Sequence, residues 1–226
     1  MDYKYTATFE APLSSCEINP ITLGASLISE ASLKNLEPLI PKDIDYNDNI
    51  DLMGVAFNAA VINQFNKNGD GMDAATAVKY ANNFIHKPTN IEHDKQKVVG
   101  HIVSAGYSNY KSSELIEENR AASMKEPFNI ALGAVLYKTV NSNFTNLVEK
   151  SLDPDSNQYQ KVSASWEVGF NDYVLAVGSD LLSEARIISD PEEISEMRGF
   201  LRSYGGNGQT DKGETIHRLI KGDIYP

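Results

Sequence analysis

The stretch VSASWEVGF, residues 162–170, alternates between apolar and small or polar side chains. At a period of two, one face carries Val162, Ala164, Trp166, Val168 and Phe170. The other face carries Ser163, Ser165, Glu167 and Gly169. This alternation predicts a β-strand with one face in the core. Two small hydroxyls on the outer face are unusual, because exposed strand positions favour threonine or larger side chains. They indicate either a merely solvated face or a serine that reacts.

The whole chain has the size and charge of one acidic globular domain. Its 226 residues are enough for one substantial core, so we expect a single domain over residues 1–226. Acidic side chains (31) outnumber basic ones (20), and the net charge of -11 repels nucleic acid and anionic lipid. Cys16 is the only cysteine, and the start of the chain lacks a signal-peptide pattern. No apolar run approaches the about 18 residues of a membrane helix. We expect a cytosolic protein without nucleic-acid or membrane partners.

The remaining patterns predict more strand than helix. Residues 52–62 are apolar and fit either a strand or a helix, while residues 128–140 are apolar on both faces, as in a buried strand. Further strands are predicted at residues 3–12, 18–32, 89–93, 98–108, 173–178, 184–189 and 213–220. Helices are predicted at residues 73–85 with Asp73 as N-cap, at 144–152, and at 190–205 with Asp190 as N-cap, Pro191 at the first position and Gly205 near the end. We therefore expect an α+β fold with a mixed β-barrel or sandwich core and peripheral helices.

The sequence offers no convincing metal site. Residues 66–71, NKNGDG, match the first half of a calcium loop, but position 12 of that loop is Ala77, which has no ligand oxygen. This favours an ordinary Asn/Gly turn. The four histidines contain no i, i+4 pair typical of a zinc helix, and one cysteine cannot supply a thiolate cluster. We expect neither a metal nor another cofactor.

His93 has a context that favours function. It lies in NIEHDKQKVVGHIV, residues 90–103, where Ile91 and His93 share one face of the predicted strand, Asp94 follows, and Gly100 comes seven residues after the histidine. A base and a nucleophile on different strands can meet across a sheet, which is how a Ser/His pair would be built here.

Taken in order, these pieces resemble the prohead, or capsid-maturation, proteases of tailed phages, a family similar to the herpesvirus assembly proteases. The resemblance covers about residues 50–195: EHD with Gly100 seven residues later, an apolar strand near residue 130, then SASWEVGF and SEARIISDP. It implies a herpesvirus-protease-like fold and a serine endopeptidase without a cofactor. The implied substrates are phage scaffold and capsid proteins and the chain itself. The implied location is the assembling prohead in the host cytoplasm.

The resemblance also implies roles for single residues. His93 matches the general base, and Ser165 matches the nucleophile, since the motif is a serine followed by an apolar residue and, in one branch of the family, Glu-Val. Glu184, seven residues before Pro191, resembles the third catalytic member in one branch of the family. The herpesvirus relatives use a second histidine instead, which keeps His101 open.

Two other acidic residues were considered for the third position. Asp94 could orient His93, although neighbours on a strand point to opposite faces. Asp190 is already explained as an N-cap. The backbone groups of an oxyanion hole cannot be placed from the sequence.

One alternative from another class stays open. In it, the chain is a non-catalytic β-rich phage assembly or scaffold protein, and Ser163 and Ser165 are only a polar strand face. The sequence also leaves open the cleavage specificity, assembly into a homo-oligomer, and a trimmed or truncated C-terminal tail, because the chain stops abruptly after a predicted strand.

Overall fold

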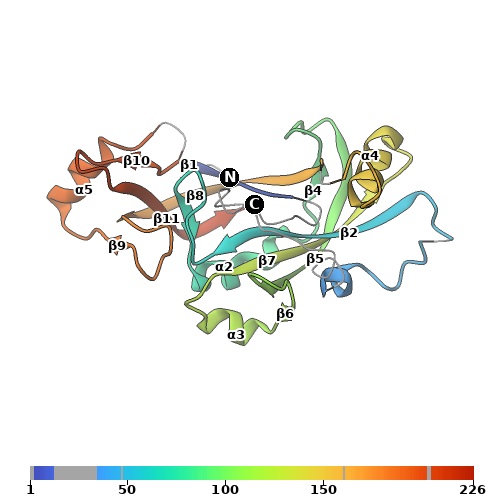
Figure 1. The fold of residues 1–226 in the computed structure, drawn as a ribbon, viewed down its shortest axis with the longest axis horizontal. Coiled ribbons are helices and arrows are strands. Elements are labelled where there is room, and N and C mark those ends of the chain that lie inside the picture. Colours follow the sequence, from blue (N-terminus) through green and yellow to red (C-terminus); the bar gives the residue numbers. More distant parts are fainter. Residues whose placement is uncertain (1–2, 13–34, 47, 160, 203–204) are drawn as a thin grey trace.

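The structure is a computed structural model that describes residues 3–12, 35–46, 48–159, 161–202 and 205–226. Over these residues the fold is α+β and consists mainly of two curled β-sheets with few helices (Figure 1). This confirms the predicted mixed β core with peripheral helices. The strand predicted at residues 18–32 lies outside the described residues.

The first sheet contains β1 (Tyr5–Pro12), β3 (Asp70–Met72), β8 (Ser163–Val177), β9 (Arg186–Ile187), β10 (Gly208–Gln209) and β11 (Thr215–Tyr225). Its strand order is β1-β8-β11-β10, with β3 beside β11 and β9 beside β8. β8 is antiparallel to both of its long neighbours, β1 and β11. β8 is therefore central to this sheet.

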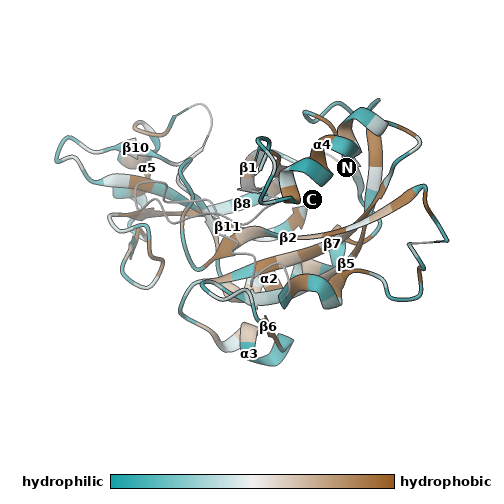
Figure 2. Cartoon of the chain, turned by 45° about the vertical axis from the view of Figure 1, so that its right-hand side comes forward, coloured by the Kyte–Doolittle hydropathy of each residue, from teal (hydrophilic) through white to brown (hydrophobic). Residues whose placement is uncertain are grey.

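The second sheet contains β2 (Leu52–Ile62), β4 (Pro88–Asn90), β5 (Val98–Asn109), β6 (Leu115–Ile116) and β7 (Phe128–Tyr137). Its strand order is β2-β7-β5-β4, with β6 beside β5. β7 is buried over nearly its whole length, which confirms the strand predicted from its two apolar faces. Residues 52–62, ambiguous in the sequence, form β2. Figure 2 shows hydrophobic residues along β2, β5 and β7.

Short helices lie around the two sheets. They are η1 (Glu37–Leu39), α2 (Ala74–Tyr80), η2 (Ala81–Phe84), α3 (Glu118–Ser123), α4 (Ser142–Leu152) and α5 (Pro191–Arg198). The predicted N-caps are confirmed: Asp73 accepts from the Thr76 N–H and Asp190 from the Glu193 N–H. α5 ends earlier than predicted, with Gly199 as C-cap. No helix in the described ranges has the length and apolar character needed to cross a membrane.

β8 confirms the alternation in residues 162–170 but is longer than predicted. Ser163, Ser165 and Glu167 are exposed, whereas Val168 and Phe170 are buried. The separate strand predicted at residues 173–178 is the second half of the same 15-residue strand. Pairing with β1 and β11 overlaps at residues 169 and 170, and β11 alone continues beside the strand at Asp172, where the sequence suggested a break.

Trp166 fixes the start of β8 against the second sheet. Its ring stacks on Phe9 at 4.8 Å between centroids and meets Phe84 edge-on at 4.6 Å. Its Nε1–H donates to the carbonyl of Ala59 in β2, at 3.1 Å. A tryptophan held by two aromatic contacts and a hydrogen bond is a strong anchor. Because neighbours on a strand point to opposite faces, this anchor holds Ser165 outward.

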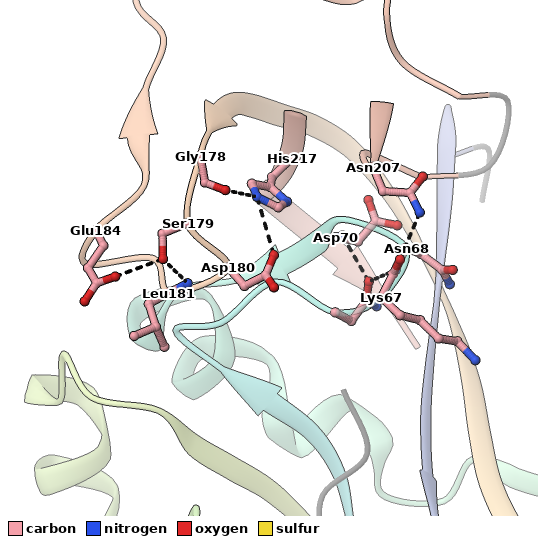
Figure 3. A network of polar contacts seen from close by, with 11 residues as sticks. Lys67, Asn68, Asp70, Gly178, Ser179, Asp180, Leu181, Glu184, Asn207 and His217 are labelled. Carbon is pink, nitrogen blue, oxygen red and sulfur yellow. Dashed lines mark hydrogen bonds and ion pairs between the residues drawn. The ribbon is translucent and has the colours of Figure 1, made fainter. Parts of the chain in front are cut away.

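At the opposite end of β8, His217 of β11 lies in a buried polar network (Figure 3). Its Nε2 lies 3.2 Å from the Gly178 carbonyl, which can only accept, so Nε2 carries the proton. Burial lowers the pKa of His217, although the Gly178 carbonyl and the Asp180 carboxylate both act to raise it. The ring is therefore neutral at neutral pH, and its 3.7 Å contact with Asp180 is not an ion pair there.

This lowered pKa predicts a loss of stability in acid. An unfolded chain binds a proton on His217 at a pKa of about 6.5, whereas the folded chain binds it only at lower pH. The free energy of unfolding is therefore expected to fall as the pH drops below that value, down to the folded pKa. Chemical unfolding at several pH values measures this slope. His217→Gln, which keeps an N–H for Gly178 but does not titrate, should show a shallower slope, and an unchanged slope would contradict the prediction.

Candidate catalytic pair

Ser165 lies near the start of β8, on the outer face of the first sheet. It is exposed, as are Ser163 and Glu167 on the same face. β1 runs beside it, with Glu10 as its register partner. The position follows from the alternation in the sequence and from the Trp166 anchor. A small hydroxyl on this face is open to a ligand and contributes little to packing.

His93 lies in a tight turn between β4 and β5, which corrects the prediction that it shares a strand face with Ile91. The Asp94 N–H donates to the Ile91 carbonyl at 3.0 Å, closing a four-residue turn. Its two central residues, Glu92 and His93, have positive φ values of 53° and 57°. The physical reason is local, since six consecutive polar residues, EHDKQK, favour a turn between two short apolar stretches.

The backbone of this turn is strained for its sequence. Turns with two positive φ values favour Asn-Gly, because only glycine adopts this region freely and asparagine tolerates it. An ordinary side chain there costs about 1–2 kcal/mol per residue. Glu92 and His93 both carry that cost. Strain of this kind concentrates at functional sites, where the surrounding structure holds it in place.

Gly100 explains how the hairpin that carries His93 is positioned. A Cβ at this residue would lie 2.1 Å from the Val135 carbonyl of β7 and 2.8 Å from the Thr89 hydroxyl of β4. A side chain would therefore push β4 or β7 away from β5. The glycine noted seven residues after His93 in the sequence allows the close packing of the three strands.

The two predicted residues meet in the structure. His93 Nε2 lies 2.6 Å from Ser165 Oγ, across 72 residues of sequence and between the two sheets. This is within hydrogen-bond reach for a serine hydroxyl and a general base. When the ring proton is on Nδ1, Nε2 accepts the hydroxyl proton, which is the arrangement that a serine nucleophile needs.

Asp94 does not orient the His93 ring. Its carboxylate accepts from the Gln96 N–H at 2.9 Å and pairs with Lys97 at 3.0 Å. Both contacts lower the pKa of Asp94, the backbone one most. The Asp94 carboxylate is therefore bound to residues of its own loop and not to the His93 ring. Among the residues that the structure describes, no side chain is hydrogen bonded to His93 Nδ1.

Glu184 is not brought to the pair. Its carboxylate accepts from the Ser179 hydroxyl at 3.0 Å, in a loop beyond the far end of β8 (Figure 3). The strand from Ser165 to Val177 spans twelve residues, or ~40 Å at the usual rise of a strand. Leu181 in the same loop bridges to Gln64, and β9 pairs back onto residues 176 and 177 of β8. The loop therefore stays at that end.

His101 also has a different partner. It lies on β5, and its Nδ1 is 2.7 Å from the Tyr137 hydroxyl of β7. Within the described residues no contact joins His101 to His93. The structure thus brings His93 and Ser165 together. It brings neither Glu184 nor His101 to this pair.

The calcium-like turn has an ordinary structural explanation. The side-chain oxygen of Asn66 accepts from the N–H groups of Asn68 and Asp70. The Asp70 carboxylate is buried and pairs with Arg218. The side-chain oxygens of Asn66 and Asp70 are therefore engaged within the fold. In the part of the chain that the structure describes, no group of three or more His, Cys, Asp or Glu side chains is arranged to hold a metal.

The strained turn is the one feature of the site that sequence reasoning missed. The polar run after Ile91 was a usable signal for a turn, but it contains neither glycine nor asparagine to mark positive φ values. Comparison of the chain with family models, with curated proteins and with solved structures found no match in any of the three. The assignment of a function therefore depends on the site itself.

Proposed function

We propose that the chain is a serine endopeptidase in which Ser165 attacks a peptide carbonyl and His93 is the general base. The observation that carries this proposal is the 2.6 Å contact between His93 Nε2 and Ser165 Oγ on an exposed face. The resemblance to the prohead proteases supplies the substrates: phage scaffold and capsid proteins, and the chain itself, inside the assembling prohead. The herpesvirus-protease-like character of the fold belongs to the same proposal.

The chemistry is acyl transfer in two steps. As Oγ of Ser165 bonds to the carbonyl carbon, its proton passes to Nε2 of His93, and His93 then gives that proton to the leaving amine. Water attacks the acyl-enzyme with the same base, which restores the serine. The described side chains provide a dyad for these steps, and the His93 residue is exposed.

The strained turn supports the proposal independently. Glu92 and His93 hold positive φ values, a region that costs free energy for any residue with a Cβ. A turn with only a connecting role would be more stable with asparagine and glycine there. A histidine at a position where positive φ lowers the stability is explained by a function of its side chain.

Labelling with a fluorophosphonate tests the proposal directly, because this reagent forms a stable bond only with an activated serine. The folded chain is expected to gain one adduct, and mass spectrometry of its peptides should place it on Ser165. Ser165→Ala and His93→Ala should both prevent labelling, while Ser163→Ala should not. A chain that is never labelled would favour the alternative of a non-catalytic assembly protein with a polar strand face.

Redesign of the turn separates stability from activity. Changing Glu92→Asn and His93→Gly together is expected to raise the free energy of unfolding by about 1 kcal/mol, because both residues then suit positive φ. The same double variant should lose all labelling. Glu92→Asn alone should gain part of the stability and keep the activity. Denaturant unfolding and fluorophosphonate labelling measure the two properties.

The matched control changes two other residues of the same loop. Lys95→Asn with Gln96→Gly makes the same kind of replacement at positions that do not have positive φ. This control should gain no stability and should keep its labelling. Equal stabilisation by both double variants would show that the turn is not strained.

Replacing Glu184 or His101 should leave the rate of peptide cleavage unchanged. A carboxylate that orients the base would cost a factor of roughly 10⁴ when changed to its amide. Glu184 bonds to Ser179 and His101 to Tyr137, so Glu184→Gln and His101→Gln are expected to cleave peptides like the unmodified chain. Peptide cleavage across pH measures this. A large loss in only one variant would identify that residue as the third member.

A further inference from the structure

The outer face of β8 carries one charged side chain beside Ser165. Glu167 lies two residues further along the same face and is exposed. Its Cα is therefore ~7 Å from that of Ser165. Within the described residues, no cation lies within ion-pair distance of its carboxylate. Among the described side chains, Glu167 thus presents a negative charge without an ion-pair partner next to the proposed nucleophile.

On the other side of β8, the described strands leave this region without a partner. β1 accompanies β8 along residues 163–170, but β11 pairs with it only from residue 169 onward. No described strand pairs with residues 163–168 on the β11 side. The path of β11, which runs antiparallel to β8 and ends opposite Gly169, points along this edge toward the start of β8 (Figure 1).

A substrate segment on this path would place its side chains in register with those of β8. Directly opposite residues of antiparallel strands share a face, with Cβ atoms about 4.5–5.5 Å apart. The residue opposite Glu167 would come two positions before the residue opposite Ser165. Opposite charges in such a pair attract, and like charges repel.

We propose that Glu167 is a specificity-determining residue, which selects a lysine or arginine side chain in the substrate on the N-terminal side of the cleaved bond, two residues before the one opposite Ser165. This inference rests on the proposed endopeptidase activity and adds to it the class of residue that the site prefers. Glu167 does not touch the reacting atoms, so its replacement should change the choice of substrate more than the rate on neutral peptides.

A peptide library derived from a whole proteome tests this without knowledge of the natural substrate. The chain and its Glu167→Gln and Glu167→Lys variants are incubated with the library, and mass spectrometry identifies the cleaved bonds. The unmodified chain should prefer lysine or arginine over acidic residues about tenfold at one position before the cleaved bond. Glu167→Gln should lose this preference, and Glu167→Lys should reverse it. At high salt the preference should shrink.

Two controls make the outcomes distinct. Glu196→Lys on α5, an exposed residue at the other end of the molecule, makes the same change in net charge and should leave the preference intact. Ser165→Ala defines the background. If the unmodified chain cleaves no more than Ser165→Ala, the proposed function fails. If it cleaves but Glu167→Lys keeps the same preference, or the preference lies after the cleaved bond, only the role of Glu167 is overturned.

Discussion

With Ser165 replaced by alanine, cleavage of a co-expressed scaffold protein is expected to fall by a factor on the order of 10⁶. The reason is that the hydroxyl is the proposed nucleophile, and among the described residues it is the only side chain hydrogen bonded to His93. The fold should remain intact, within about 0.5 kcal/mol in the free energy of unfolding, because the side chain is exposed. Gel analysis of the scaffold and denaturant unfolding of the variant measure the two effects.

Ser163 provides the matched control. It is a serine on the same exposed face, two residues before Ser165. Ser163→Ala should therefore keep nearly full activity. If Ser163→Ala is inactive and Ser165→Ala still cleaves, the nucleophile has been assigned to the wrong serine of the strand.

Replacing His93 with alanine is expected to be as damaging as the serine change. Groups that act as one catalytic unit show strongly non-additive losses, so the double variant of Ser165 and His93 should be no worse than either single variant. Alanine suits a positive φ no better than histidine does, so the stability should change little. Cleavage rates of the two single variants and the double variant give this comparison.

Additive losses would show that His93 and Ser165 belong to different sites. Circular dichroism distinguishes a loss of activity from a loss of the fold. The spectra of all three variants should match that of the unmodified chain. A His93→Ala chain that is folded and still cleaves normally would remove the histidine from the mechanism.

The local patterns in the sequence predicted the elements around the site well. The alternation in residues 162–170 placed Ser165 outward and Trp166 inward, because a period of two is a direct consequence of strand geometry. The caps at Asp73 and Asp190 were equally local, since each side chain satisfies an N–H three residues ahead. Features determined within a few residues can be read from one sequence.

The distance of Glu184 from His93 and Ser165 could not be predicted from local sequence patterns. It depends on β8 continuing through Asn171 and Asp172, two residues that normally favour a turn. Pairing with β11 overrides that preference. The register between the two strands shifts at this point, between Lys221 and Ile224 of β11. Tertiary pairing therefore decided the length of the strand, and with it the position of every residue that follows.

The meeting of His93 with Ser165 across the two sheets has a consequence for timing. The two residues are separated by 72 positions, so their contact closes a long loop that forms late in folding. The pair also requires the hairpin of one sheet and the anchored strand of the other to be in place together. A chain still being synthesised therefore lacks the proposed catalytic pair, and the proposed cleavage would begin only after the core has assembled. For the proposed protease, this delay would protect the proposed substrates until folding is complete.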